Sequence, residues 1–186
     1  MFEALLEPLL RWLRRRQVIT QIPPGSEVLD VGCGKSAALL WAISPQIKKG
    51  VGIDFKVPNT SSSNIETRQV TLNVTLPFAD ASFDVVTMLA VLEHIECEQE
   101  ILKEVHRVLR KEGKLILTVP SIWAQPVLEF LAYRLRVVDE AEIRDHKRYY
   151  NRSKLRQALI DKAQFQDFQH KYFQLWMNNF CTIVKR

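Results

Sequence analysis

The chain has 186 residues, of which 47% are hydrophobic, so one domain of this length can bury a substantial core. No apolar run reaches the roughly 20 residues that a membrane-spanning helix needs. The N-terminus has Glu3 early and its arginines after the apolar stretch, which is the reverse of the charge order in a secretory signal. Three scattered cysteines without a C-x-x-C pair argue against a structural zinc site and favour reduced thiols in the cytoplasm.

The positive charge of the chain is concentrated near its C-terminus. The formal net charge is +5, yet residues 1–133 hold 14 basic and 15 acidic side chains. Residues 134–186 hold 12 basic and 6 acidic ones, so the whole excess lies there. A basic part beside a near-neutral part favours an anionic acceptor or anionic surroundings.

Residues 1–20 form an amphipathic segment. Apolar side chains recur at helical spacing from Phe2 to Leu13, and four arginines lie between residues 11 and 16. A proline disrupts the middle of a helix, so the helix is predicted to begin near Pro8. Two interpretations stay open: a helix packed on the fold, with arginines suited to its C-terminal dipole, or a basic segment over residues 1–17 lying on a membrane.

The middle of the chain alternates between strands and helices. Strands are predicted over residues 27–31, 50–54, 66–70, 83–89 and 114–119, and helices over residues 36–43 and along the apolar stripe from Ile101 to Leu109. Residues 59–64 are predicted to form a polar loop. This alternation implies a parallel sheet with right-handed crossovers.

The pattern changes after residue 120. Helices are predicted over residues 127–138 and 152–163, with Pro126 suited to a first turn. Two strands over residues 165–172 and 179–184 should pair through a turn. Neither an internal repeat nor a second domain is visible.

The most informative stretch is a glycine turn between the first strand and the first helix of the sheet. Residues 27–34 read E-V-L-D-V-G-C-G, and the next strand ends at Asp54. Glycines let a ligand approach the backbone, and the helix start adds a positive field. A carboxylate at the end of the second strand can accept both hydroxyls of a ribose, so a nucleoside-containing ligand is predicted.

Two common nucleotide motifs fit this turn poorly. A P-loop needs a glycine where this chain has Leu29. Gly32, Gly34 and Ala37 fit the dinucleotide pattern, but Asp30 would repel a pyrophosphate. A cationic ligand would instead be attracted.

The chain resembles the class I S-adenosylmethionine-dependent methyltransferases at four motifs, which occur in the same order as in that family. Residues 30–36 read D-V-G-C-G-K-S against the family's D-x-G-x-G-x-G, with Ser36 replacing the third glycine. Residues 76–86 read L-P-F-A-D-A-S-F-D-V-V and residues 92–95 read L-E-H-I. Residues 106–120 are similar to the family's following helix, turn and fifth strand.

The resemblance implies a single methyltransferase domain over residues 1–186. Its fold would be α/β: a Rossmann-like, doubly wound and mostly parallel sheet of seven strands in the order 3-2-1-4-5-7-6. The seventh strand would be antiparallel, and helices would cover both faces. The cofactor would be S-adenosylmethionine, with S-adenosylhomocysteine as product. No metal is expected, because no set of aspartates has metal-binding spacing.

Ligands of open parallel sheets bind outside the carboxyl ends of the strands. The cofactor contacts expected there are Asp30, Gly32, Cys33, Gly34, Asp54, Phe55, Thr71, Leu72 and Leu89. The glycines would contact the methionine part, and Asp54 the ribose. Phe55 would stack on the adenine or end its strand as a core residue. Thr71 stands where the family often has an acid, and Cys33 is interpreted as a small residue that fits, because no general base accompanies it.

A general base is needed only if the acceptor must lose a proton, since alignment accounts for much of the acceleration. The candidates are His94, His146 and Tyr149, of which His94 could equally anchor the helix after the fourth strand. Residues 144–150 read R-D-H-K-R-Y-Y and resemble a segment of small-molecule, glycan and lipid methyltransferases of the family. The alternative is a charged turn that holds a lid. Residues 121–150 are predicted to form an acceptor-side lid insertion.

The segment after the fourth strand narrows the range of possible methyl acceptors. Residues 89–92 read L-A-V-L instead of N-P-P-Y or D-P-P-Y, which argues against amide or adenine nitrogens. We therefore expect methyl transfer to an oxygen, with nitrogen second, of a small-molecule or lipid- or sugar-linked acceptor in the cytoplasm, with peripheral membrane contact as an option. The alternatives are an RNA or protein methyltransferase that uses the basic C-terminal face and a silent cofactor-binding subunit. Nucleic acid ranks lower, because a short chain leaves little room for an RNA-binding module.

Overall fold

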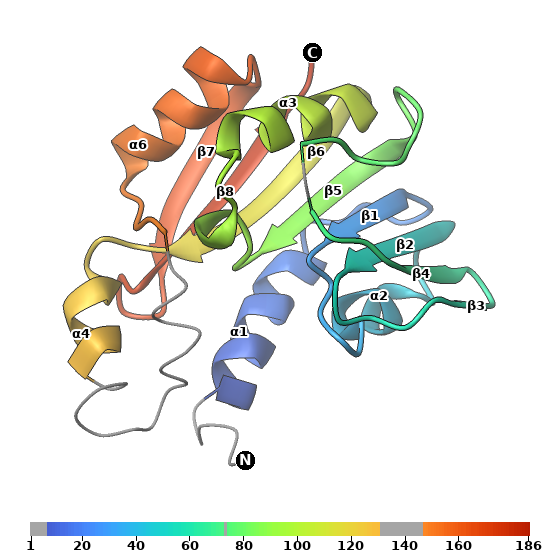
Figure 1. The fold of residues 1–186 in the computed structure, drawn as a ribbon, viewed down its shortest axis with the longest axis horizontal. Helices are drawn as coiled ribbons and strands as arrows, with labels where there is room; N and C mark the ends of the chain where they lie inside the picture. Colours follow the sequence, from blue (N-terminus) through green and yellow to red (C-terminus); the bar gives the residue numbers. More distant parts are fainter. Residues whose placement is uncertain (1–6, 73, 131–146) are drawn as a thin grey trace.

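An eight-stranded sheet forms the centre of the computed structural model, which describes residues 7–72, 74–130 and 147–186 (Figure 1). The strand order is β3-β4-β2-β1-β5-β6-β8-β7. The strands are β1 (Glu27–Val31), β2 (Lys49–Asp54), β3 (Thr60–Ser62), β4 (Ile65–Gln69), β5 (Phe83–Leu89), β6 (Leu109–Pro120), β7 (Gln166–Phe173) and β8 (Asn178–Val184).

The pairing of the strands brings their carboxyl ends to one edge of the sheet. β1 lies between β2 and β5 and is parallel to both, with Asp30 in register with Gly52 on one side and with Thr87 on the other. β4 and β6 extend the parallel part. β8 runs antiparallel to β6, with Pro120 opposite Asn178, so the β7–β8 turn lies at this same carboxyl edge.

The predicted strand order is confirmed, except for one additional strand. Without β3, the observed order is 3-2-1-4-5-7-6 with the seventh strand antiparallel. The predicted polar loop over residues 59–64 contains β3, which pairs antiparallel with β4, so the predicted count of seven strands was wrong by one. Ser63 has φ 54 and reverses the chain, and the hydroxyls of Thr60 and Thr67 lie 2.7 Å apart. The short strand covers the open edge of β4, which would otherwise expose unpaired backbone groups.

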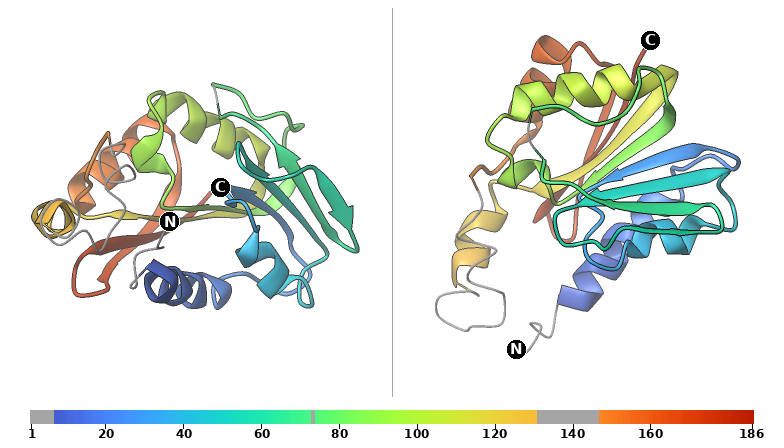
Figure 2. Two further views of the ribbon diagram at one scale, coloured as in Figure 1. Left: turned by 60° about the horizontal axis from the view of Figure 1, so that its bottom comes forward. Right: turned by 45° about the vertical axis from the view of Figure 1, so that its right-hand side comes forward.

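Helices cover both faces of the sheet (Figure 2). One face carries α1 (Glu7–Ile19) and α2 (Ala38–Ile43), which pack on buried side chains such as Val28 and Ile116. The other carries α3 (Glu98–Val108), α6 (Arg152–Arg156) and the π-helical turn η3 (Gln157–Lys162). The apolar stripe predicted between Ile101 and Leu109 is buried at all five of its positions, although Leu109 itself begins β6.

The helix boundaries follow local backbone constraints. α1 begins at Glu7, so Pro8 lies in its first turn, where a missing amide hydrogen costs little. α2 begins two residues later than predicted, because Ala37 has the left-handed φ of 46. α4 (Ala124–Phe130) covers the start of the helix predicted over residues 127–138, and residues 131–138 lie outside the described part. Among the described helices, none has the length and apolar character to cross a bilayer.

The loop between β4 and β5 is fastened to α3 by one arginine. The Arg107 guanidinium donates to the carbonyl oxygens of Leu76 (3.1 Å) and Phe78 (2.8 Å) and to the Asp80 carboxylate (2.7 Å). It also pairs with Glu104, whose carboxylate accepts the Leu76 amide hydrogen at 2.8 Å. The L-P-F-A-D motif is therefore a structural element held by side-chain hydrogen bonds.

A second motif carboxylate is structural as well. Asp84, at the amino end of β5, accepts the Glu27 amide hydrogen at 2.8 Å and a hydrogen bond from Arg110 at 2.8 Å. Arg110 also binds the Glu27 carboxylate at 2.6 Å. Hydrogen bonds from Lys48 and Arg110 lower the pKa of Glu27 to about 2. These bonds join β1, β5 and β6 at the edge opposite the carboxyl ends.

Arg107→Ala should destabilise the protein by about 2–4 kcal/mol, because two carbonyls and the Asp80 carboxylate of the loop, and Glu104 of α3, lose a charged donor. The measurement is the free energy of unfolding in urea. Lys103→Ala, on the exposed side of the same helix, is the control and should change this free energy by less than about 0.5 kcal/mol. Equal effects of the two substitutions would contradict the role of Arg107 in holding the β4–β5 loop on α3.

Candidate functional site

Two carboxylates and a glycine turn meet at the carboxyl edge of the sheet. Asp30 is near the end of β1, Gly32 to Gly34 form the turn that follows, and Asp54 ends β2. The parallel register of β1 and β2 brings these groups together from positions more than twenty residues apart. We call Asp30, Gly32–Gly34, Asp54 and the neighbouring Thr87 the cofactor edge.

Asp30 is a buried acid with one hydroxyl partner. Its side chain is 3% exposed and accepts a hydrogen bond from the Thr87 hydroxyl at 2.6 Å. Burial raises the pKa of Asp30 to about 7, with a further contribution from the Asp54 carboxylate. Thr87 was not among the predicted site residues. Its signal in the sequence is a polar side chain in the middle of the apolar strand F-D-V-V-T-M-L, in register with Asp30.

Asp54 is held in place but retains capacity for a ligand. One carboxylate oxygen accepts the Gly34 amide hydrogen at 3.0 Å, and the other accepts the Lys56 amide hydrogen at 2.7 Å. A carboxylate offers about four acceptor positions. The two that remain suit two neighbouring hydroxyls, as in a ribose.

Glycine is needed at the two positions of the turn for different structural reasons. Gly32 has φ 74, and a Cβ atom added to it would lie 2.2 Å from a methyl group of Val91, so this position has no room for a side chain. Gly34 has φ 68, and an added Cβ would meet nothing within 4 Å. The amides of Gly32 and Cys33 both donate to the Ile53 carbonyl, at 2.8 and 3.2 Å. The open space for a ligand therefore lies beside Gly34.

Cys33 fills space between the turn and the sheet. Its sulfur would lie 2.8 Å from a Cβ atom added to Gly52, so the two positions are closely packed. Burial raises the pKa of the Cys33 thiol well above its usual range, and the carboxylates of Asp30 and Asp54 raise it further. A thiol that keeps its proton is a poor nucleophile, which agrees with the interpretation of Cys33 as a small packing residue.

The other predicted cofactor contacts surround this edge. Phe55 is 57% exposed, with the Lys56 ammonium 4.7 Å from its ring centroid, so its ring is open to a stacking ligand and lies outside the core. The Val70 amide donates to the Asp54 carbonyl at 3.1 Å, which places the exposed Thr71 and the half-buried Leu72 just beyond Asp54. Leu89 is half-buried at the end of β5.

The structure brings two of the predicted acceptor-side segments together. His94 lies in the 3₁₀ turn η1 (Leu92–His94), and the Lys147 amide donates to the carbonyl of its neighbour Glu93 at 2.8 Å. Arg148 donates to the Ile95 carbonyl at 2.6 Å. These bonds dock residues 147–150, which include Tyr149, on the L-E-H-I segment. His146 lies outside the described residues.

Tyr150 and Asn179 hold this docked segment. The Tyr150 hydroxyl donates to Glu98 at 2.6 Å, and the Asn179 amide donates to the Tyr150 carbonyl at 3.1 Å. Burial raises the pKa of Tyr150 well above its usual range, and the hydrogen bond to Glu98 raises it further. Tyr150 therefore serves as an anchor, and neither residue was predicted from the sequence.

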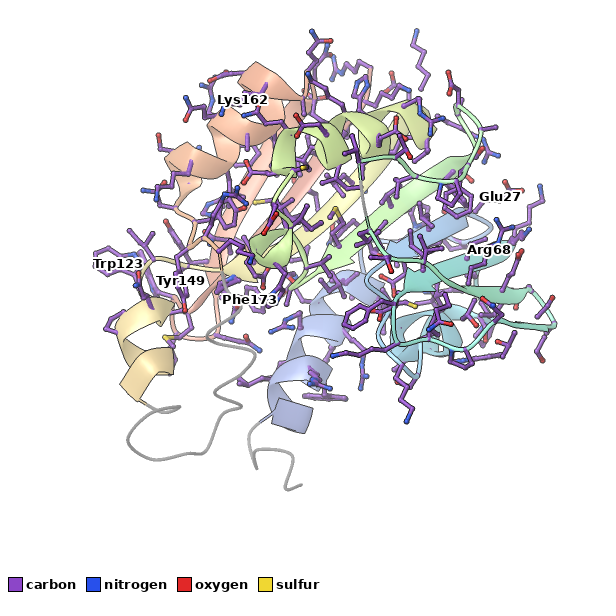
Figure 3. The ribbon with its side chains drawn as sticks, viewed as in Figure 1. Glu27, Arg68, Trp123, Tyr149, Lys162 and Phe173 are labelled. Carbon is purple, nitrogen blue, oxygen red and sulfur yellow. The ribbon has the colours of Figure 1, made fainter. Side chains whose placement is uncertain are left out.

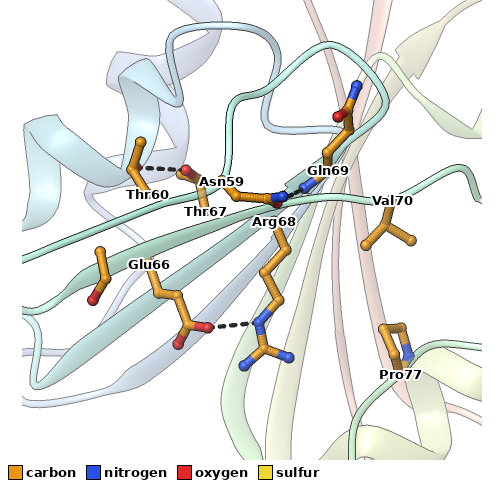
Figure 4. A pocket seen from close by; sticks show the side chains of 9 residues that line it. Asn59, Thr60, Glu66, Thr67, Arg68, Gln69, Val70 and Pro77 are labelled. Atoms are coloured by element: carbon orange, nitrogen blue, oxygen red, sulfur yellow. Dashed lines mark hydrogen bonds and ion pairs between the residues drawn. The ribbon is translucent and has the colours of Figure 1, made fainter.

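A hollow of about 650 Å³ adjoins the cofactor edge on the side of β4 (Figure 4). It is formed around β3, β4 and Pro77, and the Arg68 guanidinium inside it bonds to Glu66 at 2.6 Å. None of the predicted cofactor or catalytic residues lines it. Its chemistry gives no reason to prefer it over the carboxylates of the cofactor edge.

Comparison with known proteins identifies the family. Residues 29–117 match the methyltransferase domain family. Residues 29–117 belong to a class I S-adenosylmethionine-dependent methyltransferase domain. Its cofactor is S-adenosylmethionine. The residues present fit this cofactor, because the buried Asp30 suits a cation, Asp54 has two acceptor positions left, and the space beside Gly34 is open.

Relatives and solved structures agree with this assignment. The chain is 31% identical over 129 residues to the uncharacterized methyltransferase YcgJ of Bacillus subtilis, which covers 63% of this chain and 50% of that protein. It is 34% identical over 117 residues to a demethylmenaquinone methyltransferase of Bacillus cereus, which covers 56% of this chain and 49% of that protein. The chain thus spans about half the length of these curated relatives.

The fold itself is similar to that of a candidate methyltransferase of Haloferax volcanii, solved in complex with the methyltransferase activator Trm112. The TM-score is 0.74 at 15% identity, and the alignment covers 96% of this chain and 91% of the other.

Gly34→Ala should weaken S-adenosylmethionine binding at least tenfold, because its methyl group would occupy the open space beside the turn. The measurement is the dissociation constant by calorimetry. Gly25→Ala is a matched control, since Gly25 has a similar φ of 75, similar open space and a position outside the cofactor edge. Both variants should lose about 1–2 kcal/mol of stability from the left-handed backbone. Unchanged binding by Gly34→Ala would contradict this position for the ligand.

Asp30→Asn should stabilise the free protein at about pH 8 by up to about 4 kcal/mol and leave stability near pH 4 unchanged. The folded protein keeps the Asp30 proton up to a pKa of about 7, whereas the unfolded chain loses it near the model-compound value of 3.8. Stability therefore falls as the pH rises between these values, and asparagine removes this loss while still accepting the Thr87 hydrogen bond. Melting temperatures at both pH values measure the effect.

Asp30→Asn should also bind S-adenosylmethionine more weakly, since a neutral amide attracts a cation less than a carboxylate does. Asp84→Asn is the contrasting control, because it weakens the Arg110 pair and should lower stability at both pH values. An Asp30→Asn variant that is less stable than the natural protein at pH 8 would show that the Asp30 charge is not destabilising.

Proposed function

We propose that the protein transfers a methyl group to an oxygen, with nitrogen as the second choice, of a small-molecule or lipid- or sugar-linked acceptor. The observation that carries the proposal is the state of Asp54. Its carboxylate is fixed by two backbone amides, retains two acceptor positions, and lies beside a buried Asp30 and an open Gly34. This arrangement suits a ligand with both a ribose and a cationic group.

When bound, S-adenosylmethionine supplies a methyl group that its sulfonium charge already activates. The task of the protein is then to bind, align and exclude water. Asp54 would hold the ribose, Phe55 would stack on the adenine, and Gly34 would give the methionine part access to the backbone. An ionised Asp30 would favour the positive charges of the ligand, which in turn stabilise its ionised form.

The choice of oxygen is supported by the apolar segment after β5. Ala90 adopts φ 57, and Val91 packs against Gly32, so no polar side chain from these two positions is available to accept amino hydrogens. Alignment of acceptor and donor can supply roughly 7–11 kcal/mol without acid–base chemistry. A hydroxyl or carboxylate acceptor fits such a surface better than an amide or adenine nitrogen.

If the acceptor must lose a proton, we propose that His94, His146 or Tyr149 accepts it. His94 and Tyr149 belong to segments that dock on each other through the Lys147 and Arg148 hydrogen bonds. Tyr150 is excluded from this role, because its hydroxyl donates to Glu98 and its pKa is raised. The basic charge of residues 134–186 supports an anionic acceptor.

The proposal predicts labelled product when the protein is incubated with cell extract and S-adenosylmethionine carrying a labelled methyl group. The label should enter the small-molecule or lipid fraction. Asp54→Ala should bind S-adenosylmethionine at least tenfold more weakly and lose most of the labelling, because it removes two charged hydrogen bonds to the ribose. Asp161→Ala, on the distant η3, is the control and should retain both.

Each other outcome contradicts a specific part of the proposal. Label in RNA or protein would assign the acceptor to a macromolecule bound by the basic C-terminal part. Cofactor binding without labelling in any fraction would favour a silent cofactor-binding subunit. Equal cofactor affinity of Asp54→Ala and the natural protein would contradict the site itself.

A further inference from the structure

The turn between β7 and β8 exposes large apolar side chains on a strained backbone. Gln174, Leu175 and Trp176 are three consecutive non-glycine residues with left-handed φ angles of 50, 54 and 69. Each such residue costs free energy. The result is a tip at which Leu175 is 93% exposed and Trp176 is 62% exposed. A turn that served only to connect two strands would need neither the strain nor these side chains.

The turn is held firmly despite its strain. The Ser121 hydroxyl donates to the Trp176 carbonyl at 2.5 Å, and the Ser121 amide donates to the Met177 carbonyl at 2.9 Å. The Gln174 side chain donates to the Leu10 carbonyl of α1 at 3.0 Å. The Trp176 ring stacks on Tyr172 at 5.0 Å between centroids. The exposed side chains thus project from a fixed frame in which two tip carbonyls already have donors.

These bonds gather three segments at one end of the molecule. The turn contacts α1 through Leu10 and, through Ser121, the residues just before α4, and Figure 1 shows the turn lying between these two helices. Figure 3 places the Trp123 label at this end as well. Six of the nine large apolar side chains that are exposed in the described part of the chain belong to these segments. They are Trp12, Leu13, Trp123, Val127, Leu175 and Trp176.

The adjoining helix is strongly basic. Arginines occupy positions 11, 14, 15 and 16 of α1, and no acidic residue lies between Leu10 and Ile19. The Arg16 guanidinium lies 5.4 Å from the Trp12 ring centroid. Tryptophans beside arginines suit the boundary between lipid headgroups and acyl chains, and clustered basic residues are attracted to anionic lipids.

We propose that the β7–β8 turn, α1 and the start of α4 form a docking surface for an anionic lipid bilayer, which brings a lipid-borne acceptor to the carboxyl edge of the sheet. A bilayer is fluid and can receive side chains from three separate tips, whereas a rigid protein partner must match all three. The turn also lies at the same edge as Asp30 and Asp54, since Asn178 pairs with Pro120 at the end of β6. The choice of acceptor rests on the proposed function, but the docking does not.

The test is co-sedimentation of the protein, without cofactor, with vesicles of phosphatidylglycerol and phosphatidylcholine and with vesicles of phosphatidylcholine alone. The natural protein should bind the anionic vesicles more tightly and lose affinity as the salt concentration rises. The double variant Leu175→Ser/Trp176→Ser should bind at least tenfold more weakly, since it removes two inserting side chains. The matched control is Trp41→Ser/Val74→Ser, which removes two exposed apolar side chains outside the surface and should bind as the natural protein does.

The charge is tested separately. Arg15→Gln/Arg16→Gln should weaken binding to anionic vesicles about 25-fold, since each arginine contributes about fivefold, and leave binding to neutral vesicles unchanged. Both double variants alter exposed or half-buried positions, and melting temperatures establish that they fold. If the turn variant unfolds, Leu175→Ser alone takes its place, because that side chain touches solvent almost entirely.

Three results would overturn the proposal. One is failure of the natural protein to bind anionic vesicles, and another is equal binding by the turn variant. The third is a natural dimer that the turn variant converts to monomer without any vesicle binding, which would assign the surface to a second copy of the chain. Because the sedimentation needs no methyl transfer, failure of the proposed function leaves its result readable.

Discussion

The hydrogen bond from the Gly34 amide to the Asp54 carboxylate is the interaction on which the cofactor edge depends. It joins the turn after β1 to the end of β2, and it exists because the parallel register sets these strand ends side by side. The same bond fixes the orientation of the carboxylate and leaves its other acceptor positions available for a ligand. The strand pairing, the glycine with its left-handed φ and the acid are thus one unit, and none of the three has this effect alone.

Asp30 shows a conflict between stability and function. Its burial and its proximity to Asp54 make the ionised carboxylate unfavourable in the free protein. A cationic ligand would offset this cost, because it would supply a positive charge near Asp30. If Asp30 contacts the cofactor as we propose, relief of this unfavourable charge environment contributes to the binding free energy.

Much of the fold could be predicted because the sequence carries strong periodic and motif signals. The positions of β1, β2 and β5 follow from their apolar runs, their order follows from the family resemblance, and the glycine turn marks the edge where Asp30 and Asp54 meet. The prediction failed at β3, because three short polar residues give no apolar alternation and are set by the turn at Ser63. Thr87 and Asn179 were missed, because their partners come from other strands and are visible only once the sheet is assembled. The turn between residues 172 and 179 was predicted, but the exposure of Leu175 was not, since an apolar run between two strands does not reveal which way its side chains point.

The contact between Val91 and Gly32 limits how this domain can change its acceptor. Val91 belongs to the segment after β5, which we propose to face the acceptor, and its methyl group occupies the space where a side chain at Gly32 would be. A larger residue at position 91 would press on the Gly32–Gly34 turn, and a smaller one would leave that turn unsupported. We therefore expect acceptor range to diversify through the docked 147–150 segment, while position 91 is confined to side chains of nearly the same volume.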